Sequence, residues 1–167
     1  MMAQKIKPTK TWPFFQAYHD NNYINSHDCR PIVSLHDKEH PQIKYILNNK
    51  NAKEIVVYQI DDRLIHSKET NKCDFAIYTE DDILFFIELK GDDLNQAAKQ
   101  IRRTIEILLA PKKIKPKMLC PRIVLSKRRT PDVMPSEEKK LVQLLHNNYR
   151  GCNDYRKQTQ VFKETLQ

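Results

Sequence analysis

The apolar residues of this chain gather in short runs, and the spacing within each run predicts the element that it forms. Three runs of strand length lie close together, at residues 54–60, 73–78 and 83–90. The first five residues of the third run are all apolar, which is typical of a central strand that is covered on both faces. We therefore predict a meander of three strands, with a helix packed over the third.

The segment after this meander has helical periodicity. Its apolar residues between positions 94 and 109 fall within one arc of a helix, with Asp92 or Asp93 as the expected N-cap. Residues 123–125 predict a fourth strand, and the apolar residues within 141–145 predict a further helix.

The chain before the meander is harder to interpret. Residues 1–40 show no clear periodicity, and we expect an amino-terminal extension, a helix or arm that packs on the core. From Pro41 to residue 47 the apolar residues recur at helical spacing and predict one short helix. The expected order is helix, three strands, helix, strand and helix. This order predicts a single α/β domain over all 167 residues, with a mixed central sheet flanked by helices.

The charge of the chain favours an anionic partner such as nucleic acid, because the formal net charge is +8. Residues 1–91 contain 12 Lys and Arg against 13 Asp and Glu, whereas residues 92–167 contain 17 against 8. Two basic clusters of the second half are candidates to bind phosphates: Lys112 and Lys113 before the fourth strand, and Lys127, Arg128 and Arg129 after it. Lysines on a solvated loop are an equally good interpretation of the first cluster.

Cysteine spacing and hydropathy indicate the compartment. The four cysteines are widely separated and form no CxxC pair, so reduced thiols are the simplest interpretation. No apolar run is long enough to cross a bilayer, and the first residues do not resemble a signal peptide. We therefore expect a cytoplasmic protein without a membrane partner.

Charged residues close the apolar third strand, and they are the strongest candidates for chemistry. Glu88 and Lys90 are two residues apart, so their side chains share one face of the strand. Burying either charge alone costs several kcal/mol, which calls for a compensating partner. Asp74 lies in the neighbouring strand, and the short turn brings it alongside. We expect two carboxylates and an ammonium to meet at one strand end, either as a structural ion pair or as a site for Mg²⁺ or Mn²⁺.

These residues resemble a known motif. Asp74, thirteen intervening residues and then Glu88-Leu89-Lys90 are similar to the signature of the PD-(D/E)XK nuclease superfamily, over roughly residues 40–126. The resemblance implies a restriction-endonuclease-like core that hydrolyses phosphodiester bonds with a metal-bound water. It also implies that Asp74, Glu88 and the carbonyl of Leu89 bind the metal, and that Lys90 serves the nucleophile.

Other positions extend the resemblance. In relatives a glutamine on the following helix often completes the site, which makes Gln100, and less well Gln96, a candidate catalytic residue. Relatives often carry a glutamate on the first helix, for which Glu39 is the nearest candidate. Cys73 takes the place of the proline that names the motif, and this change removes no chemistry.

A second motif matches its pattern in sequence, but we do not expect the structure that the pattern requires. Residues 36–40 spell H-x-x-E-H, a zinc-protease pattern that requires both histidines on one helical face. Pro41 disfavours helix at His40, so we expect a solvated loop instead. With two glycines in the chain, no phosphate-cradling glycine loop is present.

The sequence therefore predicts a DNA endonuclease that uses Mg²⁺ or Mn²⁺ and acts as a homodimer or within a larger complex. Two alternatives stay open. One is a non-catalytic nucleic-acid-binding or interaction module of the same fold, and the other is an RNA-cutting enzyme.

Overall fold

The computed structural model describes residues 11–89, 91–127 and 133–167, and in these residues two β-sheets are stacked under helices. The elements in chain order are α1 (Pro13–Ala17), β1 (Ile24–Asp28), β2 (Ile32–His36), β3 (Lys44–Asn48), β4 (Ile55–Gln59), β5 (Phe75–Thr79), β6 (Ile83–Leu89), α2 (Leu94–Leu108), β7 (Met118–Leu125), α3 (Ser136–Asn148), β8 (Arg156–Thr159) and β9 (Val161–Thr165). The larger sheet has the strand order β1-β4-β5-β6-β7-β8, and the smaller has the order β2-β3-β9.

The predicted meander and crossover are present. Strands β4, β5 and β6 pair antiparallel in sequence order, and α2 then leads to β7, which pairs parallel to β6. Asp93 caps α2, since its side chain accepts a hydrogen bond of 2.9 Å from the backbone N–H of Gln96. The α/β class with a mixed sheet is therefore confirmed, and so are the helices expected after β6 and after β7.

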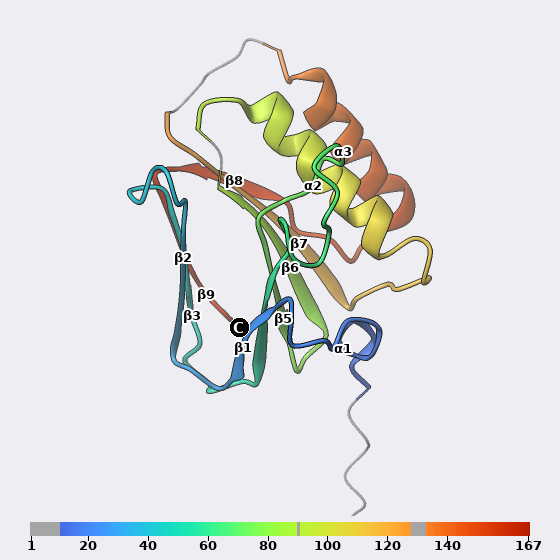
Figure 1. Ribbon diagram of the computed structural model, residues 1–167. Coiled ribbons are helices and arrows are strands. Elements are labelled where there is room, and N and C mark those ends of the chain that lie inside the picture. Colours follow the sequence, from blue (N-terminus) through green and yellow to red (C-terminus); the bar gives the residue numbers. More distant parts are fainter. Residues whose placement is uncertain (1–10, 90, 128–132) are drawn as a thin grey trace, which may run out of the picture.

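The two faces of the larger sheet are covered by different elements. Helices α2 and α3 lie side by side on one face, and the smaller sheet lies against the other (Figure 1). In β6, Leu84 and Phe86 pack toward the helices, whereas Phe85, Ile87 and Leu89 pack toward the smaller sheet. Strand β6 is therefore buried on both faces, which was the predicted reason for its apolar run. The expectation of flanking helices holds for one face only.

The helix predicted from Pro41 onward is wrong. This segment contains β3, which pairs antiparallel with β2 and parallel with β9. Ile43, Tyr45 and Leu47 are all fully buried, so the segment also carries the alternation of a strand with one buried face. Two neighbouring strands satisfy its backbone groups, and this tertiary pairing decides between the two periodicities.

The ends of the described chain supply strands that periodicity did not reveal. Within the expected amino-terminal extension, Phe14 of α1 is buried in the core, β1 forms an edge of the larger sheet, and β2 joins the smaller one. Strands β8 and β9 lie near the carboxyl end of the sequence. Strand β8 consists of polar residues, mostly exposed, and therefore lacks an apolar signal.

A buried arginine joins β7 to β9. Arg122 is 2% exposed, and its guanidinium bonds Glu164 at 2.8 Å and Asp154 at 3.1 Å. The guanidinium also lies 5.5 Å from the ring centres of Phe85 and Phe162. Burial is the largest single influence on the pKa of Arg122 and lowers it, but the hydrogen bond to Glu164 and the charge of Glu164 together with other nearby groups raise it above its usual value. This ion pair fastens β9, and with it the smaller sheet, to the larger sheet.

We predict that Arg122→Leu lowers the free energy of unfolding by about 3 kcal/mol or more, because it removes the arginine from the mostly buried carboxylate of Glu164. Arg156→Gln is the matched control, since Arg156 bonds the same Asp154 but its side chain is 58% exposed. We expect the control to change stability by less than about 1 kcal/mol. Urea unfolding of the three proteins measures both values, and equal losses would show that the buried pair has no special role.

Candidate active site

The adjoining ends of β5 and β6 bring Asp74 and Glu88 together. Asp74 directly precedes β5, and the next residue, Phe75, pairs with Ile87. Asp74 is the next residue beyond this pairing, beside the end of β6 that carries Glu88. Both carboxylates therefore belong to one end of the larger sheet.

Asp74 is held by backbone groups on both sides. Its N–H donates to the carbonyl of Ile87 at 3.2 Å, and its carbonyl accepts from the N–H of Ile60 at 2.9 Å. Its carboxylate Oδ2 accepts a hydrogen bond of 2.9 Å from the backbone N–H of Leu89. A side-chain oxygen thus takes the place of a backbone carbonyl beside β6. The orientation of this carboxylate is consequently set by the strand that carries Glu88.

Glu88 is buried, with 2% of its surface exposed. By the alternation of β6 it shares the helix-facing side with Phe86, in surroundings where a carboxylate needs compensation. Both carboxylates affect the pKa of the Cys73 thiol. Burial is the main cause that raises the pKa of Cys73, and the charges of Glu88 and Asp74 raise it further. The two acidic groups therefore both lie close enough to Cys73 to act on its thiol.

Three polar side chains of α2 hold the residues that lead into Asp74. Gln96, Gln100 and Thr104 lie on successive turns of the helix and bond to segment 71–73. The bonds run from Gln96 Nε2 to Asn71 Oδ1 (2.8 Å), from Gln100 Nε2 to the Lys72 carbonyl (3.0 Å), and from the Cys73 N–H to Thr104 Oγ1 (2.8 Å). We call this contact the α2 clamp. Because segment 71–73 lies outside the strands, side chains satisfy part of its backbone.

Gln100, the predicted catalytic glutamine, is a member of the α2 clamp and helps to position the backbone before Asp74. Gln100 donates to the backbone before Asp74, and this bond occupies its amide nitrogen. A catalytic role for Gln100 stays a prediction. Thr104, which is fully buried, was missed by sequence reasoning: its place on the apolar arc of α2 indicates burial but not the partner of its hydroxyl. Its hydroxyl also donates to the carbonyl of Gln100 at 2.8 Å, which links the members of the clamp.

A pocket of about 220 Å³ opens beside Asp74, between the two sheets. One wall comes from the ends of β4 and β5, and the opposite wall from the turn after β2. Its lining residues are His36, Asp37, Lys38, Glu39, Gln59, Asp61, Asp74 and Phe75. Glu39 thus shares a pocket with Asp74, although it lies on a turn and not on the helix that relatives of the motif use.

The turn after β2 contains the H-x-x-E-H motif and determines where its two histidines lie. Asp37 Oδ1 accepts hydrogen bonds from the N–H groups of Glu39 (2.7 Å) and His40 (2.9 Å), which folds the string into a tight turn. His36 is the last residue of β2. The two histidines therefore do not share a helical face, as the position of Pro41 predicted.

The structure separates the predicted phosphate-binding residues. Lys127 follows β7 at the sheet end that carries Glu88, because β6 and β7 run parallel. Lys112 and Lys113 precede β7 and lie at the other end, a strand length of about 20 Å away. Lys112 places its ammonium 5.0 Å from the ring centre of Tyr18. Lys90, Arg128 and Arg129 lie outside the described residues.

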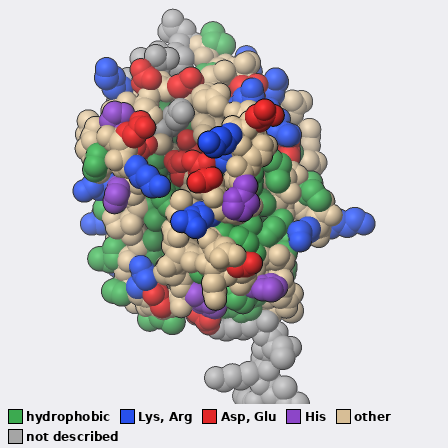
Figure 2. Space-filling view, viewed as in Figure 1, with side chains coloured by type: hydrophobic (Ala, Val, Ile, Leu, Met, Phe, Trp, Pro, Cys, Tyr) green, Lys and Arg blue, Asp and Glu red, His purple; other side chains and the backbone are tan. Residues whose placement is uncertain are grey.

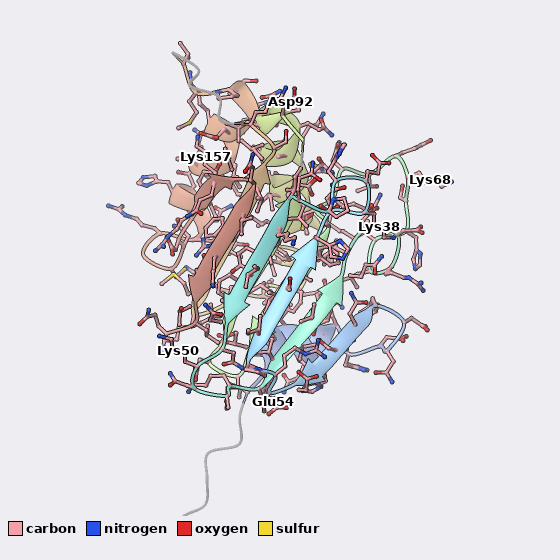
Figure 3. All side chains as sticks on the ribbon, turned by 90° about the vertical axis from the view of Figure 1, so that its left-hand side faces the viewer. Lys38, Lys50, Glu54, Lys68, Asp92 and Lys157 are labelled. Carbon is pink, nitrogen blue, oxygen red and sulfur yellow. The ribbon has the colours of Figure 1, made fainter. Side chains whose placement is uncertain are left out.

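The face of the molecule drawn in Figure 2 does not carry one uniform basic patch. Figure 2 shows acidic side chains gathered near the middle of one face, with Lys, Arg and His side chains around them. In Figure 3, Lys38 and Lys68 lie toward the same end of the molecule as Asp92, whereas Lys50 and Glu54 lie toward the other end. Basic side chains are therefore present near the end that carries Asp74 and Glu88, interspersed with acidic ones.

The remaining observations concern ligands and relatives. Within residues 11–89, 91–127 and 133–167, no three His, Cys, Asp or Glu side chains form a group that could hold a metal ion. No helix in the described ranges is both long enough and apolar enough to cross a membrane. Comparison with protein-family models, curated proteins and solved structures gives no match to the chain.

We predict that Thr104→Val loosens the approach to Asp74. Valine has the shape of threonine without the hydroxyl, so the buried N–H of Cys73 loses its acceptor and the unfolding free energy falls by about 1–3 kcal/mol. Amide hydrogen exchange at Cys73 should also become faster. Thr104→Ser retains the hydroxyl and serves as the control. Unchanged exchange at Cys73 in Thr104→Val would contradict the role of the α2 clamp.

Proposed function

We propose that this chain is a metal-dependent endonuclease with a restriction-endonuclease-like core, which hydrolyses phosphodiester bonds of DNA. The observation that carries the proposal is the hydrogen bond from the N–H of Leu89 to the carboxylate of Asp74, which holds Asp74 at the end of β6 beside the buried Glu88. Two carboxylates at one strand end supply hard oxygen ligands of the kind that a divalent cation takes. Such a pair is also what phosphodiester hydrolysis with a divalent ion requires.

The order of elements supports the proposal. Strands β4, β5 and β6 form the meander, α2 makes the crossover, and β7 adds the parallel strand. This is the strand-strand-strand-helix-strand order that the resemblance implies. The helix expected before the meander is replaced by β3, so the support comes from the part of the core that contains Asp74 and Glu88.

The donor atoms at this strand end suit a hard divalent cation. The carboxylates of Asp74 and Glu88 would hold Mg²⁺ or Mn²⁺, and the backbone carbonyl of Leu89 is the third proposed oxygen donor. When bound, such an ion supplies an acidified water and polarises a phosphate oxygen. The chain's own contribution is positional. The N–H of Leu89 orients the carboxylate of Asp74, and the α2 clamp fixes the backbone that precedes it.

Charge supports nucleic acid as the substrate. The net charge of +8 favours a polyanion, and Lys127 lies at the same sheet end as Glu88. We assign Lys90 the role of assisting the nucleophile, on the strength of its place two residues after Glu88. DNA is the proposed substrate, and RNA serves as the comparison in the test.

The decisive test incubates the protein with plasmid DNA, branched DNA and labelled RNA in Mg²⁺. We expect DNA cleavage by wild type and a loss of about a hundredfold or more in Asp74→Asn, Glu88→Gln and Lys90→Ala, with binding largely retained. Asp81→Asn is the control carboxylate, because Asp81 lies at the opposite end of the β5–β6 hairpin, where it pairs with Lys53.

The outcomes distinguish the three functions. Cleavage of RNA alone would favour the RNA-cutting enzyme. Salt-sensitive binding without cleavage in any divalent ion would favour the non-catalytic module. Cleavage that persists in Asp74→Asn and Glu88→Gln would contradict the proposed site.

A further inference from the structure

The smaller sheet has one face that the described fold leaves uncovered. Alternate residues of β2, β3 and β9 are buried against the larger sheet. The residues between them form the opposite face, which we call the outer face: every second residue of the three strands, counted from Ile32, Lys44 and Val161. This face looks toward the viewer in Figure 3, and no helix or strand of the described residues lies in front of it.

The outer face carries basic side chains and no acidic one. Lys44 and Lys163 are exposed, and His36 lies beside Lys44 in the register of β2 and β3. The register of β3 and β9 sets Lys163 one strand across and two residues along from Lys44, so their Cα atoms are about 8 Å apart. Glu164 of β9 points to the other side of the sheet and bonds Arg122. The charge of the outer face is therefore positive.

Apolar side chains cross the same face on a diagonal. The two registers place Ile32, Ile46 and Val161 on successive strands, each displaced by two residues from the one before. Ile32 is 54% exposed and Val161 is 45% exposed. Exposed apolar side chains that adjoin one another mark a contact surface, whereas singly scattered ones need no explanation. This strip indicates that the outer face has a binding partner.

The outer face adjoins the pocket beside Asp74. His36 belongs to the face and also lines that pocket, as does Lys38 of the turn after β2. Basic side chains therefore continue from the pocket across the smaller sheet, from Lys38 and His36 to Lys44 and Lys163.

We propose that the outer face binds the phosphate backbone of duplex DNA next to the bond that is cut, an inference that rests on the proposed nuclease function. Lysines bind phosphates whatever the base sequence, and no carboxylate of this face repels them. The apolar strip packs against the sugars between the phosphates. None of the residues of the outer face is aromatic, so it offers no ring on which the bases of a single strand could stack.

The test measures binding of a labelled DNA duplex by fluorescence anisotropy without divalent ions, so that no cleavage is needed. Lys44→Gln/Lys163→Gln removes two charges from the outer face. The matched control, Lys139→Gln/Lys140→Gln, removes two exposed charges from α3, on the helix-covered side of the larger sheet. Circular dichroism verifies that both proteins are folded.

We expect the outer-face variant to bind the duplex roughly tenfold or more weakly at about 100 mM NaCl. Its plot of log affinity against log salt concentration should be shallower by about 1.8, because each phosphate contact contributes about 0.9. The control should keep the slope of wild type. Ser34→Glu, which adds a carboxylate to the exposed centre of β2, should also weaken binding.

The outcomes separate this inference from the proposed function. A variant that loses duplex binding while wild type cleaves nothing in Mg²⁺ supports the outer face and contradicts the nuclease. Cleavage by wild type together with an unchanged salt slope in Lys44→Gln/Lys163→Gln overturns the outer face alone. A dimer that dissociates in this variant, seen by sedimentation, with duplex binding retained, would assign the face to a second copy of the chain and overturn the proposal.

Discussion

The structure is organised around an acidic pair at the end of a strand that is otherwise apolar. Glu88 has 2% of its surface exposed, and hydrogen bonds to Ile87 and Leu89 hold Asp74 beside the end of the same strand. Two carboxylates in such surroundings repel one another and lose hydration, so the fold must hold them in place against a substantial cost. The hydrogen bond from the N–H of Leu89 to Asp74 is one contact that holds this carboxylate in place. In the proposed function, this arrangement would serve as the binding site of a divalent cation.

The rest of the fold makes this strand end rigid. Helices cover one face of β6 and the smaller sheet covers the other, so the strand is enclosed on both faces. The α2 clamp fixes the segment before Asp74, while Arg122 ties the smaller sheet to β7 through Glu164. Neither the α2 clamp nor the Arg122–Glu164 pair contacts the carboxylates through the bonds described here. Rigid elements that carry the site are what precise placement of catalytic groups requires.

Much of the central sheet could be predicted from the sequence, because local pattern and tertiary environment agree there. An apolar run that ends in Glu88 implies a central strand, and the short turn before it implies an antiparallel neighbour that carries Asp74. The helix after β6 has both an apolar arc and an aspartate cap. These features need only the periodicity of the chain itself.

The smaller sheet could not be predicted in the same way. Its strands β3 and β9 pair although they are far apart in the sequence, and β3 carries apolar residues that also fit a helix. The nearness of Glu39 to Asp74 depends on this sheet, so the pocket between the two sheets was hidden from sequence reasoning. Likewise, the bond between Thr104 and Cys73 joins a helix to a loop, and no local pattern encodes it.

The central claim is that Glu88 and Asp74 together hold a divalent cation, and stability measurements test it without any assumption about substrate. A ligand that binds only the folded state raises the unfolding free energy by about 2.7 kcal/mol at a hundredfold excess over its Kd. We predict a rise of this kind for wild type on addition of Mg²⁺ or Mn²⁺, and none for Glu88→Gln. An equal rise in both proteins, or no rise in wild type, would contradict the account.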